Sequence, residues 1–240
     1  MSRLDAEMVK RCIVKSRNAA QQIIKEEKVF VNGSMISKAS FSVNDEDSIV
    51  IKGPLPKYVG RGGLKLEKAV NEFNISLSDK ICIDIGASTG GFTDCMLQNG
   101  AKLVYAVDVG KNQLDISLRN DKRVISLEET DVREAEGIIS EKADFISVDV
   151  SFISLKLVLP EVKKLLKKDG QAVALIKPQF EVGKSGLGKH GVVKSDTLRN
   201  KAVNEIKDFA EQIGFAVQGL TQSPITGGDG NIEFLIYLFN

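Results

Sequence analysis

Apolar positions along most of the chain fall into short, nearly continuous runs, separated by segments with the length and spacing of helices. Runs rich in β-branched residues indicate strands that are buried on both faces. The predicted strands are residues 80–86, 103–109, 123–129, 143–150, 171–177, 214–220 and 232–239. Buried strands that alternate with helices predict an α/β fold, with a doubly wound, mostly parallel, Rossmann-like sheet.

A smaller α+β pattern precedes this sheet. Residues 4–14 and 16–27 have the periodicity of two amphipathic helices, and Ser16 is a predicted N-cap of the second. Two further runs, 28–33 and 47–53, are predicted strands. Prolines and glycines then interrupt the pattern in "GPLPKYVGRGG". We therefore predict a small N-terminal domain over 1–53, a Gly/Pro linker over 54–63 and the sheet domain over 64–240.

Composition narrows the class of protein. With 240 residues and 42% hydrophobic content the chain can bury a full core, and its net charge of +1 confines any nucleic-acid binding to local basic patches. The N-terminus has no apolar signal region, and no run approaches the roughly 18 apolar residues of a membrane span. Cys12, Cys82 and Cys95 lack metal-ligand spacing and are odd in number. We expect reduced thiols, a cytoplasmic protein, no membrane association and no metal.

A glycine-rich loop in "IDIGASTGGFTDCML" follows the first strand of the predicted sheet. Ligands of doubly wound sheets bind beyond the carboxyl ends of the strands, so this loop is the predicted cofactor site. A dinucleotide fingerprint needs glycine at the second position after Gly86, where this chain has Ser88. The loop residues expected at the cofactor are Gly86, Ala87, Ser88, Thr89, Gly90, Gly91 and Phe92.

Acidic residues at successive strand ends favour a cationic nucleoside ligand. Asp84 precedes the loop, where a carboxylate suits an ammonium or sulfonium group better than a pyrophosphate. Asp108 ends the next strand and can accept hydrogen bonds from both ribose hydroxyls. Asp131, beside Val132, can accept a hydrogen bond from an adenine amino group. The series predicts S-adenosylmethionine as the cofactor, although the same acids could simply cap strands and helices.

Four further charged residues stand in or near the predicted crevice. Asp149 and Lys177 end apolar strands, Glu233 begins the last strand, and Lys65 lies on the helical segment after the linker. Each alone could be a solvated strand end or a lysine that extends to solvent. Asp149 and Lys177 fall at the carboxyl ends of neighbouring predicted strands and face the same crevice as the glycine loop. Taken together, the four residues predict an active site.

The whole chain resembles the TlyA or hemolysin-A-type rRNA methyltransferases, which join an S4-like RNA-binding domain to an FtsJ-type ribose 2′-O-methyltransferase domain. The N-terminal stretch "LDAEMVKRCIVKSRNAAQQIIKEEKVFVNG" resembles the S4-like domain. The remaining matches are "VGRGGLKLEKAV", "DIGASTGGFTDCMLQNGAKLVYAVDVG", "DVSFISL", "LIKPQFE" and "GGDGNIEFL". The family's catalytic Lys-Asp-Lys-Glu tetrad corresponds, motif by motif, to Lys65, Asp149, Lys177 and Glu233.

The resemblance implies an S-adenosylmethionine-dependent enzyme that methylates the ribose 2′-hydroxyl of ribosomal RNA, at a cytidine, on RNA or on a ribosomal subunit. A ribose hydroxyl is a poor nucleophile, so Lys177 is expected to orient and deprotonate it. Only RNA carries this hydroxyl. The basic residues expected to contact RNA phosphates are Arg3, Lys10, Arg11, Lys15, Arg17 and Lys25.

Two alternatives of other classes stay open at this stage. A nucleotide-dependent oxidoreductase would account for the sheet and for Asp108, but it fails the glycine spacing and gives the four charged residues no role. The historical name of the family suggests the second alternative, a membrane-active hemolysin. Its difficulty is that the apolar strands are needed for the protein's own core.

Overall fold

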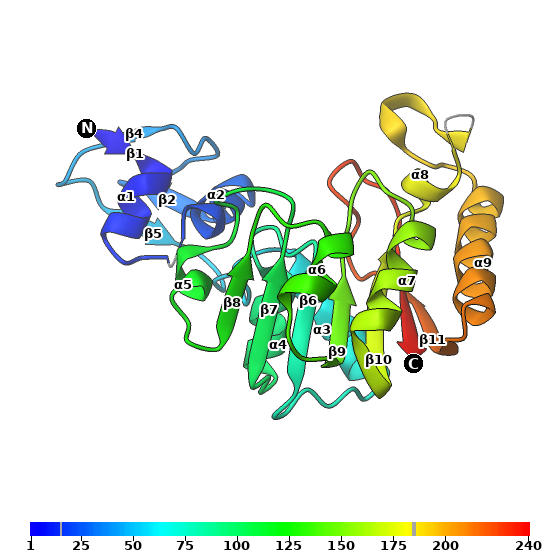
Figure 1. Ribbon diagram of the computed structural model, residues 1–240. Helices are drawn as coiled ribbons and strands as arrows, with labels where there is room; N and C mark the ends of the chain where they lie inside the picture. Colours follow the sequence, from blue (N-terminus) through cyan, green and yellow to red (C-terminus); the bar gives the residue numbers. More distant parts are fainter. Residues whose placement is uncertain (15, 184–185) are drawn as a thin grey trace.

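The computed structural model describes residues 1–14, 16–183 and 186–240. Figure 1 shows a small N-terminal part, in blue, and a larger part built on a central sheet. The N-terminal part contains helices α1 (Leu4–Lys10) and α2 (Arg17–Lys25) with short strands, which are β1 (Ser2–Arg3), β2 (Val29–Val31), β3 (Ser34–Met35), β4 (Ser42–Val43) and β5 (Ile49–Ile51).

Apolar side chains of both helices and of β2 form a core of their own in the N-terminal part. Its most buried members include Leu4, Met8, Ile23 and Val29, each with no exposed surface. The Ser16 hydroxyl accepts a hydrogen bond from the backbone N–H of Ala19, which confirms the predicted N-cap. The first helix ends at Lys10 rather than at residue 14, because Cys12 adopts a left-handed φ of 55°.

The larger part confirms the predicted α/β fold. Its seven-stranded sheet has the order β8-β7-β6-β9-β10-β12-β11. All neighbouring pairs from β8 to β10 are parallel, and β12 is antiparallel to both of its neighbours. The strands are β6 (Ile81–Ile85), β7 (Leu103–Val107), β8 (Val124–Leu127), β9 (Ala143–Val148), β10 (Leu166–Ile176), β11 (Ala216–Gln222) and β12 (Phe234–Phe239).

Helices cover both faces of this sheet, as buried parallel strands require. One apolar cluster packs α6, α7 and α9 against the sheet, and a second packs α3, α4 and α5 against the opposite face. The helices are α3 (Gly62–Glu72), α4 (Gly91–Gln98), α5 (Ile116–Arg119), α6 (Val132–Ile138), α7 (Leu155–Leu165), α8 (Pro178–Glu181) and α9 (Asp196–Gln212), with a short 3-10 turn at Lys189–Gly191.

The strand order reverses its direction at one place in the sheet. The chain moves outward from β6 through β7 to β8, then returns to the other side of β6 and continues through β9 and β10. Loops that leave the carboxyl ends of β6 and β9 therefore diverge and leave room for a ligand between them. Within the described residues, no helix is long and apolar enough to cross a membrane.

Candidate active site

The four charged residues predicted from the sequence lie together. Lys177 Nζ is 2.6 Å from Asp149 Oδ1, and Lys65 Nζ is 2.6 Å from Glu233 Oε2. The two pairs meet at Asp149, whose Oδ2 lies 4.0 Å from Lys65 Nζ. The Glu233 side chain is only 2% exposed, whereas that of Asp149 is 20% exposed. The Asp149 and Lys177 end of the cluster is therefore the end that a substrate can reach.

The sheet register explains this convergence. Asp149 follows β9 directly, and Lys177 follows β10, its parallel neighbour. Glu233 precedes β12, which pairs antiparallel with β10 so that Ile176 lies opposite Phe234. The antiparallel strand thus brings a residue from near the C-terminus to the same edge. Lys65 enters from the first turns of α3.

Further contacts tie the segment after β9 to the segment after β10. Lys177 donates a hydrogen bond to the Ser151 hydroxyl at 2.8 Å. The Glu181 carboxylate accepts from the Ser154 hydroxyl at 2.6 Å and from the backbone N–H of Leu155 at 3.0 Å, at the start of α7. The motifs "DVSFISL" and "LIKPQFE" therefore form one structural unit around the lysine.

Phe152 is a residue that sequence reasoning missed. Its side chain is 91% exposed, its φ is 64°, and its ring lies 5.1 Å from that of Phe180. A left-handed φ is uncommon for a bulky residue and often marks a functional site. The only available signal was its position beside Asp149 in the matched motif, because exposure and backbone strain cannot be read from a sequence.

Two adjoining cavities open at the carboxyl ends of the strands. The larger, of about 460 Å³, lies between the loops that follow β6, β7 and β9, and its lining includes Asp108, Asp131 and Val132. The smaller, of about 210 Å³, is lined by the glycine loop together with Asp149 and Lys177. Residues common to both linings are Gly86, Ser88, Asp149 and Ser151.

Most of the predicted loop residues line these cavities. Gly86, Ala87, Ser88, Thr89, Gly91 and Phe92 do so. Gly86 has φ 80°, and a Cβ there would lie 2.5 Å from the carbonyl oxygen of Asp149. Only glycine therefore lets the loop approach the end of β9 so closely. Gly90 is not in either lining. Its φ of 94° instead lets α4 begin where Leu118 packs.

The predicted direct contact between Asp84 and the cofactor is wrong in this conformation. Asp84 has no exposed surface, and its carboxylate accepts hydrogen bonds from the Thr93 hydroxyl at 2.7 Å and the Ser147 hydroxyl at 2.9 Å. It ties β6 to β9 and to the start of α4, behind the loop. Burial raises its pKa to about 6, although the hydrogen bonds from Thr93 and Ser147 oppose that rise.

The raised pKa of Asp84 predicts a pH-dependent cost to stability. Between an unfolded pKa of 3.8 and a folded pKa of about 6, the unfolded chain loses the proton first, so stability falls as pH rises through this window. The difference corresponds to at most about 3 kcal/mol of unfolding free energy. Asp84→Asn should therefore gain stability relative to wild type between pH 4 and pH 7, as urea unfolding would measure. A stability difference that stays constant over that range would contradict this assignment.

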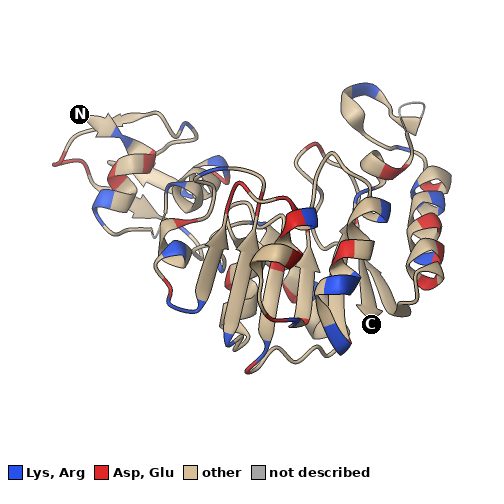
Figure 2. Ribbon diagram, viewed as in Figure 1, with Lys and Arg blue, Asp and Glu red and all other residues tan. Residues whose placement is uncertain are grey.

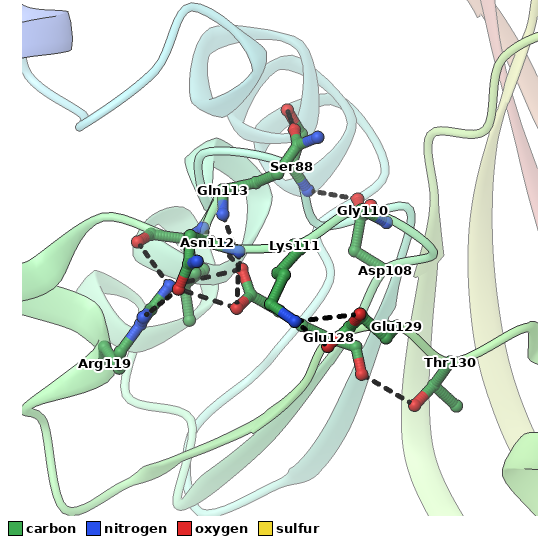
Figure 3. Close-up of polar contacts among 11 residues, drawn as sticks. Ser88, Asp108, Gly110, Lys111, Asn112, Gln113, Arg119, Glu128, Glu129 and Thr130 are labelled. Atoms are coloured by element: carbon green, nitrogen blue, oxygen red, sulfur yellow. Dashed lines mark hydrogen bonds and ion pairs between the residues drawn. The ribbon is translucent and has the colours of Figure 1, made fainter.

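Asp108 and Asp131 stand at the larger cavity as predicted, but both already have partners. Asp108 accepts the backbone N–H groups of Ser88 and Gly110, each at 2.7 Å, which joins the glycine loop to the loop after β7 (Figure 3). Asp131 caps α6 and pairs with the Arg133 guanidinium, which holds the pKa of that carboxyl down at about 2. Each carboxylate keeps lone pairs for a ligand.

The glycine loop does not offer a pyrophosphate site. The backbone N–H groups of Gly86 and Ala87 bond to the Val107 carbonyl, and that of Gly90 bonds to Ala87. A Cβ on Gly91, the first residue of α4, would lie 2.9 Å from the backbone N of Gly63, so the linker and α3 cover this helix start. A dinucleotide needs those N–H groups and that helix end, so this loop disfavours the oxidoreductase alternative.

Several of the basic residues predicted to contact RNA form ion pairs within the N-terminal part. Arg3 and Arg17 both pair with Asp5, a fully buried acid whose pKa they and Gln21 hold well below its usual range. The Arg3 and Arg17 side chains are still about half exposed, at 50% and 55%. They can therefore serve as counter-ions and still reach a phosphate.

The other basic residues predicted to contact RNA differ in their exposure and in their ion pairs. Arg11 pairs with buried Glu7 and donates to the carbonyls of Asn44 and Asp47, and its side chain is only 23% exposed. These contacts give Arg11 a structural role, and its predicted contact with RNA stays a prediction. Lys10 pairs with Asp45 at the surface and Lys25 is exposed. Lys15 lies outside the described residues. Figure 2 shows that acidic and basic residues are interspersed over both parts.

Comparison with known proteins agrees with this architecture. The FtsJ-like methyltransferase family model matches residues 58–239, and the S4 domain model matches residues 2–49. The chain is 40% identical over 239 residues to the 16S/23S rRNA (cytidine-2′-O)-methyltransferase TlyA of Mycobacterium tuberculosis, covering 99% of this chain and 89% of the relative. It is 45% identical over 237 residues to Hemolysin A of Brachyspira hyodysenteriae, covering 98% of each.

A solved structure of a candidate hemolysin from Streptococcus thermophilus superimposes with a TM-score of 0.79 at 48% identity, over 99% of this chain and 88% of that one. Fold, site and matches together define a methyltransferase that carries an N-terminal S4 domain. The chain belongs to the FtsJ-like methyltransferase family, in its TlyA and hemolysin-A branch.

Proposed function

We propose that the protein transfers a methyl group from S-adenosylmethionine to a ribose 2′-hydroxyl of ribosomal RNA, at a cytidine. The observation that carries this proposal is the position of Asp149 and Lys177 where the two cavities join. A methyl group held at that junction would lie between the nucleoside cavity and the smaller cavity, beside Lys177. The relative from Mycobacterium tuberculosis is named for this reaction.

The residues at the cavities fit the proposed cofactor. A volume of about 460 Å³ is within the usual range for small-molecule sites, and Asp108 stands where ribose hydroxyls need acceptors. The smaller cavity suits the methionine end, because it runs from the glycine loop to Lys177. When bound, S-adenosylmethionine supplies an electrophilic methyl group, and its sulfur keeps the electron pair of the broken bond.

The protein's part of the reaction is then to place the hydroxyl and take its proton. Lys177 Nζ is held by Asp149 and Ser151, which fixes its direction and leaves its third position for the 2′-oxygen. As a neutral amine it accepts the proton while the oxygen attacks in line. Positioning of this kind supplies much of the barrier reduction, and a general base adds roughly 10²- to 10⁴-fold.

The other members of the tetrad hold Lys177 in place. Asp149 faces both lysines, so its negative charge is shared between Lys65 and Lys177. Glu233 in turn keeps the Lys65 ammonium in a nearly buried position. This arrangement balances the charges of two acids and two lysines in a site that is mostly shielded from water.

Phe152 gives the target nucleotide a surface to stack on. Its exposed ring, backed by Phe180, lies three residues beyond Asp149 and lines the larger cavity. Aromatic stacking on an unstacked base contributes about 1 to 3 kcal/mol and holds single-stranded RNA without reading a duplex groove. A base held there would bring its ribose toward Lys177.

The S4 domain supplies the RNA-binding role. We propose that Arg3, Arg17, Lys10 and Lys25 contribute most of the phosphate contacts, because these side chains are more exposed than that of Arg11. All four tetrad residues lie after the linker, so the N-terminal part delivers the substrate and takes no part in the chemistry. Lysis is the weaker alternative, because the apolar strands β6, β9 and β10 are buried in the protein's own core.

Calorimetry on Asp108→Ala tests the cofactor assignment. Hydrogen bonds to a charged acceptor contribute about 1.5 to 3 kcal/mol, so the variant should bind S-adenosylmethionine roughly ten- to a hundredfold more weakly than wild type. Wild-type protein should bind this ligand in preference to NAD. Unchanged affinity in the variant would remove Asp108 from the ribose site, and tight NAD binding would restore the oxidoreductase alternative.

A further inference from the structure

Loop 109–114, which follows Asp108, closes one side of the larger cavity without any regular secondary structure of its own. Val109 and Gln113 both belong to the cavity lining. The Gln113 side chain reaches toward the glycine loop, where its Oε1 is 3.5 Å from the Ser88 hydroxyl. A residue in this position faces any ligand held in the larger cavity beside Asp108 and Ser88.

The Glu128 carboxylate holds the second half of this loop. Glu128 accepts hydrogen bonds from the backbone N–H groups of Gln113 at 2.6 Å and of Asn112 and Leu114 at 3.0 Å (Figure 3). Arg119 approaches both oxygens of the same carboxylate, at 3.1 and 3.3 Å. Burial raises the pKa of Glu128, but the N–H groups of the loop outweigh burial and leave it below the ordinary value.

The strand end that carries Glu128 is also joined to Asp108. The backbone N–H of Thr130 bonds to the Asp108 carbonyl, and that of Glu129 bonds to the Gly110 carbonyl, each at 3.0 Å. Backbone hydrogen bonds therefore join Asp108 to the segment that contains Glu128. The Glu128 side chain in turn holds the backbone of Gln113, so the positions of Asp108 and Gln113 are linked. A charged acceptor with three N–H donors is among the stronger ways to order a loop.

We propose that Glu128 is a positioning residue that sets cofactor affinity by holding Gln113 against Ser88 in the lining of the larger cavity. The proposal rests on the proposed use of S-adenosylmethionine. Glu128 itself is absent from the cavity lining, so it acts through the loop and not by touching the ligand. Gln113 is the residue through which this effect reaches the nucleoside.

Glu128→Gln tests the proposal with little change in volume. One acceptor oxygen becomes an NH₂ donor that faces backbone N–H groups, so at least one loop hydrogen bond is lost. We expect calorimetry to show about tenfold weaker binding of S-adenosylmethionine, with an unchanged methyl-transfer rate at saturating cofactor. Glu129→Gln is the matched control, because Glu129 is the neighbouring acid, is 61% exposed and pairs only with Lys111 at the surface among its described contacts. Its affinity should stay within about twofold of wild type.

Gln113→Ala keeps the test decisive if Glu128→Gln lowers stability. This variant removes the positioned side chain and leaves the anchor intact, and it should weaken binding by a similar factor. The double variant should bind about as weakly as either single variant, because both changes remove one interaction. Wild-type affinity in Glu128→Gln, or fully additive losses in the double variant, would overturn the proposal. Failure of wild-type protein to bind S-adenosylmethionine would overturn the proposed function instead.

Discussion

Lys177→Ala is expected to lose roughly 10²-fold or more of the single-turnover methyl-transfer rate, the scale for removing a general base. The structure gives the physical reason. Lys177 lines the smaller cavity, where its Nζ contacts the Ser151 hydroxyl and Asp149, a residue that lines both cavities. Affinity for S-adenosylmethionine should change far less than the rate, because Lys177 lines only the smaller cavity, at the methionine end, and not the larger cavity proposed for the nucleoside. Single-turnover kinetics with labelled cofactor, with folding checked by thermal unfolding, would measure the effect.

Lys177→Arg separates proton transfer from charge pairing. A guanidinium can still pair with Asp149, but it stays protonated and cannot accept the hydroxyl proton. We therefore expect no recovery of the rate. If arginine restored nearly wild-type activity, Lys177 would only brace Asp149, and the base assignment would be wrong.

Lys65→Ala is expected to destabilise the protein by about 3 to 5 kcal/mol, as for other buried pairs that lose one partner. Its partner Glu233 is 2% exposed and would be left buried without its counter-ion, 2.6 Å from where the ammonium had been. Asp149 would lose its second cation as well. Urea unfolding at pH 7 would measure the loss as a change in the free energy of unfolding.

The double variant Lys65→Met with Glu233→Leu is the control for that prediction. Replacing both charges by apolar groups removes the unpaired acid, so most of the lost stability should return while methyl transfer stays low. Equal stability of Lys65→Ala and wild type would show that solvent can stabilise the Glu233 charge without Lys65. In that case the pair would not be the rigid support that the proposed mechanism requires.

The sequence was sufficient to predict the sheet and the meeting of the four charged residues. Strand positions follow from apolar runs, and parallel strands bring their carboxyl ends to one edge, so Asp149 and Lys177 had to be neighbours. The position of Glu233 could not be predicted from the strand pattern alone. It reaches the site because β12 inserts antiparallel beside β10, and strand order is not written in local periodicity. Its charge in an apolar strand marked it as a candidate, and the family resemblance supplied its place in the tetrad.

What the sequence could not predict depends on side-chain environment. Asp84 has the same local pattern as a cofactor ligand, yet Thr93 and Ser147 enclose it, and these contacts come from separate elements. Arg11 was one basic residue among several until its pairing with buried Glu7 distinguished it. Hydrophobic periodicity predicts burial of apolar residues but not which acids lie beneath them, and those acids decide which arginines remain free for RNA.

Identifying the methylated nucleoside tests the central claim most directly. Ribosomal subunits that lack the modification would be incubated with the protein and labelled S-adenosylmethionine, and the rRNA digested to nucleosides for mass spectrometry. We predict that the label appears in 2′-O-methylcytidine and that the Lys177→Ala protein leaves it nearly absent. Label on a base, or no transfer to rRNA by protein that binds S-adenosylmethionine, would contradict the account.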